Sequence, residues 1–142
     1  MMTDREAIQQ LMATYAFAID AKDYAGITAC FTDDAAVEYA GHSHRVTGRA
    51  AIADLMERQL APLDVTQHMF TNFIIQVECD KGQVRCDMLA QHIRRGVPGG
   101  EKYMAGGQYS AEVRRTPGGW KIARIAARTL WSEGNPNLLS RV

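Results

Sequence analysis

The sequence has neither an excess of one charge nor a long apolar run, and both absences narrow the possible partners. Its 16 lysine and arginine residues balance 16 aspartate and glutamate residues, with a pI near 6.9. A phosphate-tracking surface, and with it a nucleic-acid partner, is therefore not expected. No segment approaches the roughly 18 apolar residues of a membrane span, and the polar first residues have no apolar stretch behind them. We expect a cytoplasmic protein without a membrane partner.

Cysteine and cofactor motifs are also scarce. The three cysteines, Cys30, Cys79 and Cys86, lack close Cys-x-x-Cys spacing, so we interpret them as small buried hydrophobic residues and expect neither disulfides nor a zinc site. His42 and His44 would lie on one side of an extended segment, but their turn-like context argues against a metal pair. Dinucleotide fingerprints, phosphate loops and nucleophile elbows are absent. The sequence therefore predicts no metal and no organic cofactor.

The length and the first 21 residues predict one domain that begins with a helix. A chain of 142 residues can bury one sizeable core, so we expect a single domain over residues 1–142. Thr3 and Glu6 have capping-box spacing, and apolar residues then recur at helical intervals. This pattern predicts a helix over residues 4–21. Asp20 projects from the edge of its apolar stripe, where it can turn toward a cavity or toward water.

Two shorter helical patterns and one strand follow. A second helix is expected to begin at residues 22–24, and Asp33 with Asp34 is interpreted as a stop and a turn into a strand. That strand is expected over residues 36–40, followed by a polar turn at residues 41–45. A third helix is predicted over Arg49–Leu60, ended by a proline two residues later.

The second half of the sequence has the pattern of long strands separated by tight turns. Strands are expected over residues 66–79, 83–95, 103–115 and 120–131, with an irregular tail from Glu133. The adjacent glycines at 106 and 107 predict a bulge that helps the sheet to curl. This order predicts an α+β fold, with about three N-terminal helices packed on a curved, mainly antiparallel sheet. A curled sheet covered by a helix encloses a pocket.

Several short motifs, in their order and spacing, give nearly the whole chain a resemblance to a known family. They are Tyr15 with Asp20 and Asp23, residues 31–35, residues 46–52, Gln67 with His68, and residues 119–122. The chain resembles SnoaL-like domains of the nuclear-transport-factor-2-like (NTF2-like) superfamily, which have a cone-shaped, cystatin-like α+β fold. Scytalone dehydratase, bile-acid 7α-dehydratase and hexachlorocyclohexane dehydrochlorinase share this fold. Function needs separate arguments, because the fold also hosts isomerases, cyclases, hydrolases and binding modules.

His68 and Asp20 are the leading candidates for a catalytic pair. His68 enters a long strand, and Asp20 lies on another element expected to be buried. A carboxylate that keeps one imidazole nitrogen protonated turns the other toward substrate as a base. The resemblance to the bile-acid dehydratase and the dehydrochlorinase implies the same pair, because a helix-1 aspartate and a strand histidine stand there at the same interval of 48 positions.

The resemblance also implies two further catalytic residues. Tyr15 stands where the bile-acid dehydratase type has a site tyrosine and would donate to a departing or carbonyl oxygen. Arg124 stands where the dehydrochlorinase has a site arginine and would stabilise developing negative charge. From its own pattern, however, Tyr15 also fits core packing, and Arg124 fits a salt-bridged strand residue.

Four residues are predicted to bind substrate. Met88 falls where scytalone dehydratase has a second pocket histidine, and Gln91 where the bile-acid enzyme has a second aspartate, so the chain departs from both patterns. Asp87 shares a strand face with Gln91, and Phe70 completes the set. His92, beside two arginines, is interpreted as a surface strand residue.

Three functions are compatible with these residues. The first is a cofactor-independent lyase, of the dehydratase or dehydrohalogenase type, in which His68 deprotonates a small, largely apolar cyclic substrate and water or halide leaves. The second is an isomerase or polyketide-cyclase-type proton transfer by the same pair. The third is a non-catalytic small-molecule-binding domain. The resemblance further implies a homodimer or homotrimer packed through the outer face of the sheet.

Overall fold

The computed structural model describes residues 1–39 and 44–139. These residues form three α-helices, six strands and one short 3₁₀ helix. In chain order the elements are α1 (Asp4–Asp20), α2 (Tyr24–Ala29), β1 (Phe31–Tyr39), β2 (His44–Thr47), α3 (Arg49–Leu60), β3 (Val65–Glu78), β4 (Lys81–Ile93), β5 (Lys102–Thr116), β6 (Gly119–Gly134) and η1 (Pro136–Leu138).

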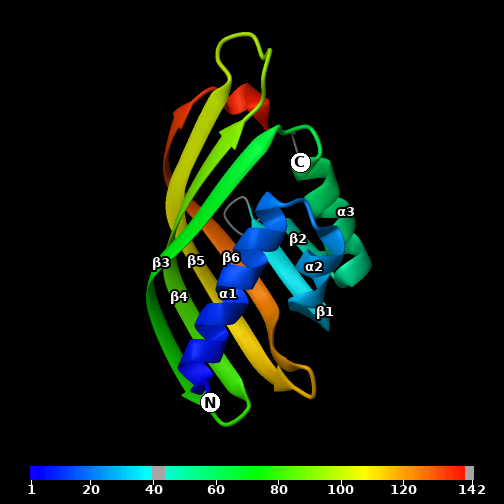
Figure 1. The fold of residues 1–142 in the computed structure, drawn as a ribbon, viewed down its shortest axis with the longest axis vertical. Coiled ribbons are helices and arrows are strands. Elements are labelled where there is room, and N and C mark those ends of the chain that lie inside the picture. Colours follow the sequence, from blue (N-terminus) through cyan, green and yellow to red (C-terminus); the bar gives the residue numbers. More distant parts are fainter. Residues whose placement is uncertain (40–43, 140–142) are drawn as a thin grey trace.

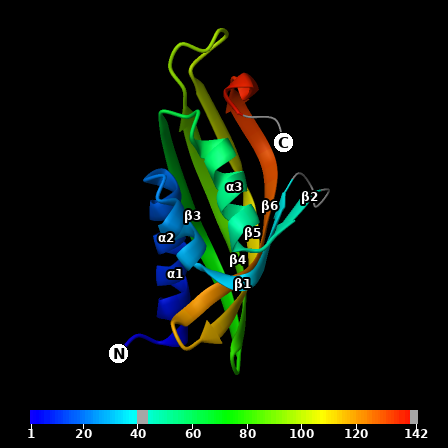
Figure 2. The same ribbon diagram turned by 90° about the vertical axis from the view of Figure 1, so that its right-hand side faces the viewer.

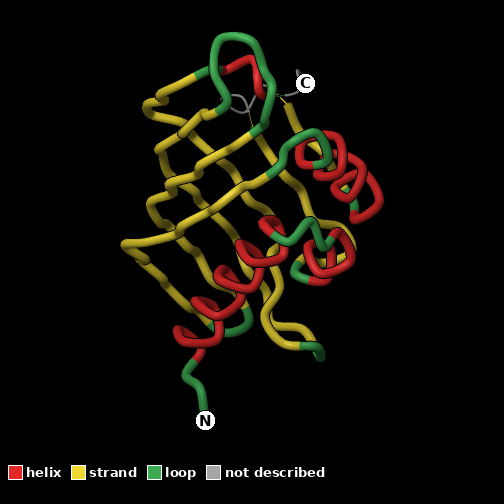
Figure 3. Tube along the Cα trace, turned by 45° about the horizontal axis from the view of Figure 1, so that its top comes forward, coloured by secondary structure: helices red, strands yellow, loops and turns green. Residues whose placement is uncertain are grey.

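The strands form one mixed sheet in the order β2-β1-β6-β5-β4-β3. The antiparallel meander predicted for the second half of the chain runs from β3 to β6, and β1 lies parallel to β6 (Figure 1). The three helices cover one face of this twisted sheet (Figures 2 and 3). The predicted α+β class, with three helices on a mainly antiparallel sheet, is therefore confirmed.

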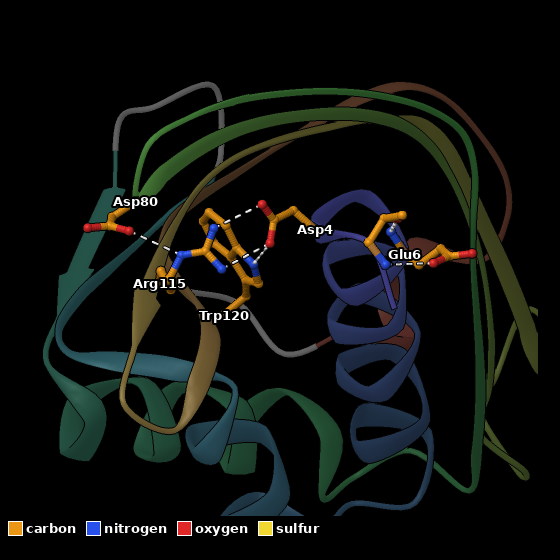
Figure 4. A network of polar contacts seen from close by, with 6 residues as sticks. Asp4, Glu6, Asp80, Arg115 and Trp120 are labelled. Atoms are coloured by element: carbon orange, nitrogen blue, oxygen red, sulfur yellow. Dashed lines mark hydrogen bonds and ion pairs between the residues drawn. The ribbon is translucent and has the colours of Figure 1, made fainter. Parts of the chain in front are cut away.

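The first helix begins as the sequence predicts and is tied to the sheet at its start. Thr3 Oγ1 accepts from the Glu6 backbone N–H, and Glu6 Oε2 accepts from the Thr3 N–H, so the capping box is complete. Asp4 accepts two hydrogen bonds of 2.9 Å from Arg115, which also bonds Asp80 and lies over the Trp120 ring (Figure 4).

Among the described residues, no helix is long and apolar enough to cross a membrane.

The start of β1 differs from the prediction. Asp33 and Asp34 lie inside this strand instead of ending a helix, because Phe31 already pairs with β6 and a register shift then interrupts the ladder. The two exposed acids occupy that irregular stretch. There Asp33 pairs with Arg49 at 2.9 Å, and Asp34 pairs with Arg114 at 3.3 Å. Two adjacent aspartates are typical of a turn, but here the ion pairs with Arg49 and Arg114 neutralise their charges within a strand.

Two other predicted boundaries need correction. His44 and Arg45 were expected in a polar turn but lie in β2. The other residues of that turn, 41–43, and the expected end of the preceding strand at residue 40 lie outside the described residues. The described part of the tail from Glu133 is largely regular, because β6 continues to Gly134 and η1 follows. Asn135 and Leu138 are buried there. The Asn135 amide group donates to two backbone carbonyls of the β4–β5 loop, which ties this segment to the sheet.

The predictions for the adjacent glycines and for the three cysteines have different outcomes. The pairing of β5 with β6 shifts register between Gly106 and Gly107, so the predicted bulge is confirmed. A Cβ atom on Gly107 would lie 2.0 Å from the Arg128 carbonyl oxygen, which only glycine avoids. Cys30 and Cys86 are buried as predicted. The prediction is wrong for Cys79, which is exposed in the β3–β4 turn.

Candidate functional site

A cavity of about 270 Å³ lies between the helices and the sheet face that they cover. Residues from α1, α3 and five strands line it, most of them apolar. Leu139, after η1, contributes to the same wall. The polar side chains in the lining are those of Tyr15, Glu38, Tyr39, Gln59, His68, His92 and Tyr109. This composition suits an apolar ligand that carries a few polar groups.

The Asp20 carboxylate contacts His68, which lines this cavity. The last residue of α1 is Asp20, and its Oδ1 lies 2.8 Å from His68 Nδ1 in β3. The backbone N–H of His68 donates to Asp20 Oδ2 at 2.9 Å. An ionised carboxylate can only accept, so the chemistry assigns the proton to His68 Nδ1 and leaves Nε2 as the acceptor.

Asp20 is held in its ionised form. Burial alone would raise the pKa of its carboxyl, but the hydrogen bonds from the His68 ring and backbone outweigh that effect. Thr66 adds another donor, from its hydroxyl to Oδ1 at 2.9 Å. The net result is a pKa below the ordinary value of aspartate, so the carboxylate is charged at neutral pH.

His92 is a site residue that the sequence interpretation missed. It was assigned to the surface because of its arginine neighbours, but it follows Val84, Cys86, Met88 and Ala90 on the buried face of β4. This alternation was the available signal, since side chains of a strand change face at every residue. The His92 ring centroid lies 5.9 Å from that of His68, at an angle of 79°.

The environment of His92 keeps its imidazole neutral. Burial lowers its pKa, although the hydrogen bond to the Tyr103 carbonyl partly opposes that shift. Its Nδ1 lies 2.9 Å from the Tyr103 carbonyl oxygen, which can only accept. The proton of neutral His92 is therefore on Nδ1, as in His68. Neutral His92 thus presents an unprotonated Nε2 in the cavity lining.

Tyr15 and Tyr109 place two neutral phenols in the lining. Burial raises the pKa of Tyr15 well above its ordinary value and that of Tyr109 to about 12, so both keep their protons at neutral pH. Phe70 lies between them, stacked on Tyr15 at 6.3 Å and tilted against Tyr109 at 4.9 Å. Phe70 therefore supports the two tyrosine rings, and it is not among the residues that line the cavity.

Arg124 lies away from the cavity. Its neighbour Ile125 lines the wall, so Arg124 projects from the opposite face of β6. There its guanidinium contacts Glu38 at 3.3 Å and Glu112 at 3.6 Å. Arg124 is therefore not among the residues that line the cavity, and its contacts are those of a salt-bridged strand residue.

Three predicted substrate-binding residues also lie apart from the cavity wall. Asp87 and Gln91 alternate with the buried residues of β4 and so project from the outer face, where Asp87 accepts from Asn72 at 2.7 Å. Met88 is on the inner face and buried, but it is not part of the lining. None of these three residues is part of the cavity lining, whereas His92, four positions after Met88, is.

The cavity residues do not form a recognisable metal site. In residues 1–39 and 44–139, no group of three histidine, cysteine, aspartate or glutamate residues could hold a metal ion. The His44 ring stacks on Tyr39 at 5.4 Å, and its possible partner His42 lies outside the described residues.

Comparison with known proteins identifies the family. Residues 1–126 match the SnoaL-like domain family. The terrestric acid biosynthesis cluster protein E of Penicillium crustosum is 31% identical over 140 residues, which cover 94% of this chain and 88% of that protein.

Solved structures from Novosphingobium aromaticivorans agree with this match. A proposed aromatic ring hydroxylase is 30% identical, with a TM-score of 0.86 over 95% of each chain. A proposed scytalone dehydratase is 27% identical, with a TM-score of 0.85 over 93% of this chain and 87% of that chain. An NTF2-like protein with a cystatin-like fold is 27% identical, with a TM-score of 0.78 over 97% and 90%. The NTF2-like fold is confirmed, and the chain belongs to the SnoaL-like domain family.

Proposed function

We propose that this protein is a cofactor-independent lyase in which His68 deprotonates a small, largely apolar cyclic substrate. The contact of 2.8 Å between His68 Nδ1 and Asp20 Oδ1, at the wall of an apolar cavity, carries the proposal. Asp20 keeps the Nδ1 proton in place, so Nε2 is available as the base. The same carboxylate stabilises the imidazolium that forms when Nε2 takes a proton.

The elimination follows from these groups. Nε2 of His68 removes a proton from the carbon next to the one that bears the leaving group, the carbon–oxygen or carbon–halogen bond breaks, and a carbon–carbon double bond forms. A departing hydroxyl takes the proton back from His68 and leaves as water, whereas a halide leaves without one. The neutral phenols of Tyr15 and Tyr109 are donors for a carbonyl or departing oxygen. Nε2 of His92 accepts from a substrate hydroxyl.

The cavity and the relatives support this substrate class. A volume of about 270 Å³ is just below the range of roughly 300–1,000 Å³ of common ligand pockets, which favours a compact aromatic or alicyclic molecule. The Penicillium crustosum relative is named for a biosynthesis cluster, and one solved relative is a proposed scytalone dehydratase. Another is a proposed aromatic ring hydroxylase, which also suggests a cyclic ligand.

A second candidate is an isomerase or cyclase-type proton transfer by the same pair, because the contact between His68 and Asp20 serves either reaction equally. His68 would then return its proton to another carbon of the same intermediate. A third possibility, ligand binding without turnover, requires neither transfer.

We also propose a homodimer or homotrimer through the outer face of the sheet. Met69 and Ile74 project from the exposed side of β3, and Trp131 lies over Gly106 of β5. Their side chains are about half exposed on the sheet face that the helices leave uncovered, where a second copy of the chain would cover them.

The test is a screen of cyclic hydroxylated and halogenated compounds for elimination in deuterated water. Loss of water or halide supports the lyase, whereas deuterium incorporation without loss supports the isomerase. His68→Asn should abolish either reaction and Asp20→Asn should lower its rate, and Asp54→Asn, at an exposed position of α3, is the control for the carboxylate lost in Asp20→Asn. Binding without either reaction, or turnover that survives His68→Asn, would exclude His68 as the base.

A further inference from the structure

Thr66 is a buried polar residue that the proposed reaction does not use. It lies in β3 two residues before His68 and is 7% exposed. Its Oγ1 is 2.9 Å from Asp20 Oδ1, the oxygen that also receives His68 Nδ1. In the sheet, Thr66 lies directly opposite His92 of β4, so it is a close neighbour of both histidines.

The direction of this hydrogen bond is determined by its acceptor. A carboxylate has no proton at neutral pH, so the Thr66 hydroxyl donates to Asp20. Asp20 then accepts three hydrogen bonds from one strand segment: two on Oδ1, from Thr66 and the His68 ring, and one on Oδ2, from the His68 backbone. Three donors from a rigid strand orient the plane of the carboxylate.

The carboxylate needs this support because of its place in the chain. Asp20 ends α1, and Lys22, two residues later, has a left-handed backbone with φ of 54°. The Asp20 side chain is 23% exposed, so water can compete for its oxygens. Without the Thr66 donor, Oδ1 would keep a single protein contact, with a ring that can rotate and change tautomer.

We propose that Thr66 is a positioning residue that holds Asp20 Oδ1 on the Nδ1 proton of His68. The hydroxyl acts through the carboxylate, and its effect is to keep Nε2 of His68 unprotonated. Its consequence for turnover rests on the proposed function, but its effect on the tautomer does not. If Thr66 only satisfied its own buried hydroxyl, an isosteric apolar residue would leave the His68 tautomer unchanged.

The experiment measures the His68 tautomer by ¹⁵N NMR of the imidazole nitrogens, at a pH where the ring is neutral. The His68 signals are assigned as those that are absent from the spectrum of His68→Asn. In the wild type, the Nδ1–H form should dominate. Thr66→Val should transfer part of the population to the Nε2–H form, and Thr66→Ser should restore it. Thr32→Val is the matched control, since Thr32 is also buried and donates at 2.9 Å to a carboxylate, that of Asp34.

The outcomes separate the two proposals. A wild-type tautomer population in Thr66→Val, or an equal change in Thr32→Val, would overturn the positioning role, even if turnover fell. A tautomer change in a protein that never turns over any compound would keep the positioning role and remove the lyase. With a substrate in hand, Thr66→Val should lower kcat about tenfold, with little change in KM. If Thr66→Val does not fold, Thr66→Cys, which retains only a weak donor, should show the same change in smaller measure.

Discussion

Replacing Asp20 by asparagine should invert the tautomer of His68 while leaving the fold intact. The new amide has one acceptor oxygen and one donor group where the carboxylate has two acceptors. The His68 backbone N–H, which donates to Oδ2 at 2.9 Å, cannot reverse its direction. The amide oxygen must therefore take the Oδ2 place, and the amide NH₂ takes the Oδ1 place.

The other two partners can adapt to that orientation. The Thr66 hydroxyl can rotate to accept from the NH₂, and His68 can accept at Nδ1 if its proton moves to Nε2. All three hydrogen bonds then persist, but none is charge-assisted. Because charged hydrogen bonds are about twice as strong as neutral ones, while a neutral amide is easier to bury, we expect a loss of about 1–2 kcal/mol in the free energy of unfolding.

The effect on activity should be much larger than the effect on stability. A protonated Nε2 cannot take a proton from substrate, so Asp20→Asn should lose about 10²–10⁴-fold in kcat, the range typical of general-base catalysis. Urea unfolding, ¹⁵N NMR of His68 and turnover measure the three consequences separately. An Nδ1–H tautomer retained in Asp20→Asn, or a stability loss above about 4 kcal/mol, would refute this reasoning. Asp54→Asn should match the wild type in all three measurements.

Three further predictions concern the C-terminal Asn135, the acid stability of the fold and Tyr109. Asn135→Ala removes two donors to the Pro98 and Gly100 carbonyls and one acceptor for the Asn137 N–H, so it should cost about 1–3 kcal/mol in urea unfolding; a result equal to that of the exposed-side-chain control Asn137→Ala would contradict the anchoring role. The folded-state pKa of Asp20 is lowered, so its stabilising contribution is present above its ordinary value of 3.8 and is lost as the pH falls through the folded pKa; acid titration of stability should therefore be shallower for Asp20→Asn, and parallel curves would disprove it. Tyr109→Phe keeps the ring packing on Phe70, so thermal unfolding should change little while turnover falls about 10–100-fold; unchanged turnover would remove Tyr109 as a donor.

The alternation of faces along a strand explains why some predicted site residues do not line the cavity. Arg124 and Asp87 are each adjacent in sequence to a residue of the inner face, so a shift of one position decides which side of the sheet they occupy. Such shifts come from bulges, such as the one between Glu112 and Val113 where β5 pairs with β6 beside Arg124, and a bulge depends on how two strands pair. An alignment of two sequences matches positions, but it does not show where bulges occur, so it does not determine which face of the sheet a residue occupies.

Local patterns were sufficient for most of the elements. The capping box and apolar stripe of α1, and the long alternating strands with glycine turns, depend on interactions within a few residues, so the sequence alone predicted them. The interval between Asp20 and His68 also pointed to a pair, and the two side chains are in contact.

Only the tertiary structure decided which side chains share the cavity. The pairing of β1 beside β6 brings Asp33 and Asp34 to arginines from distant elements, which turned an apparent turn signal into part of a strand. The packing of β4 between β3 and β5 brings His92 to His68 and gives its Nδ1 proton a carbonyl acceptor. These arrangements depend on contacts between residues far apart in sequence, and local propensity contains no information about them.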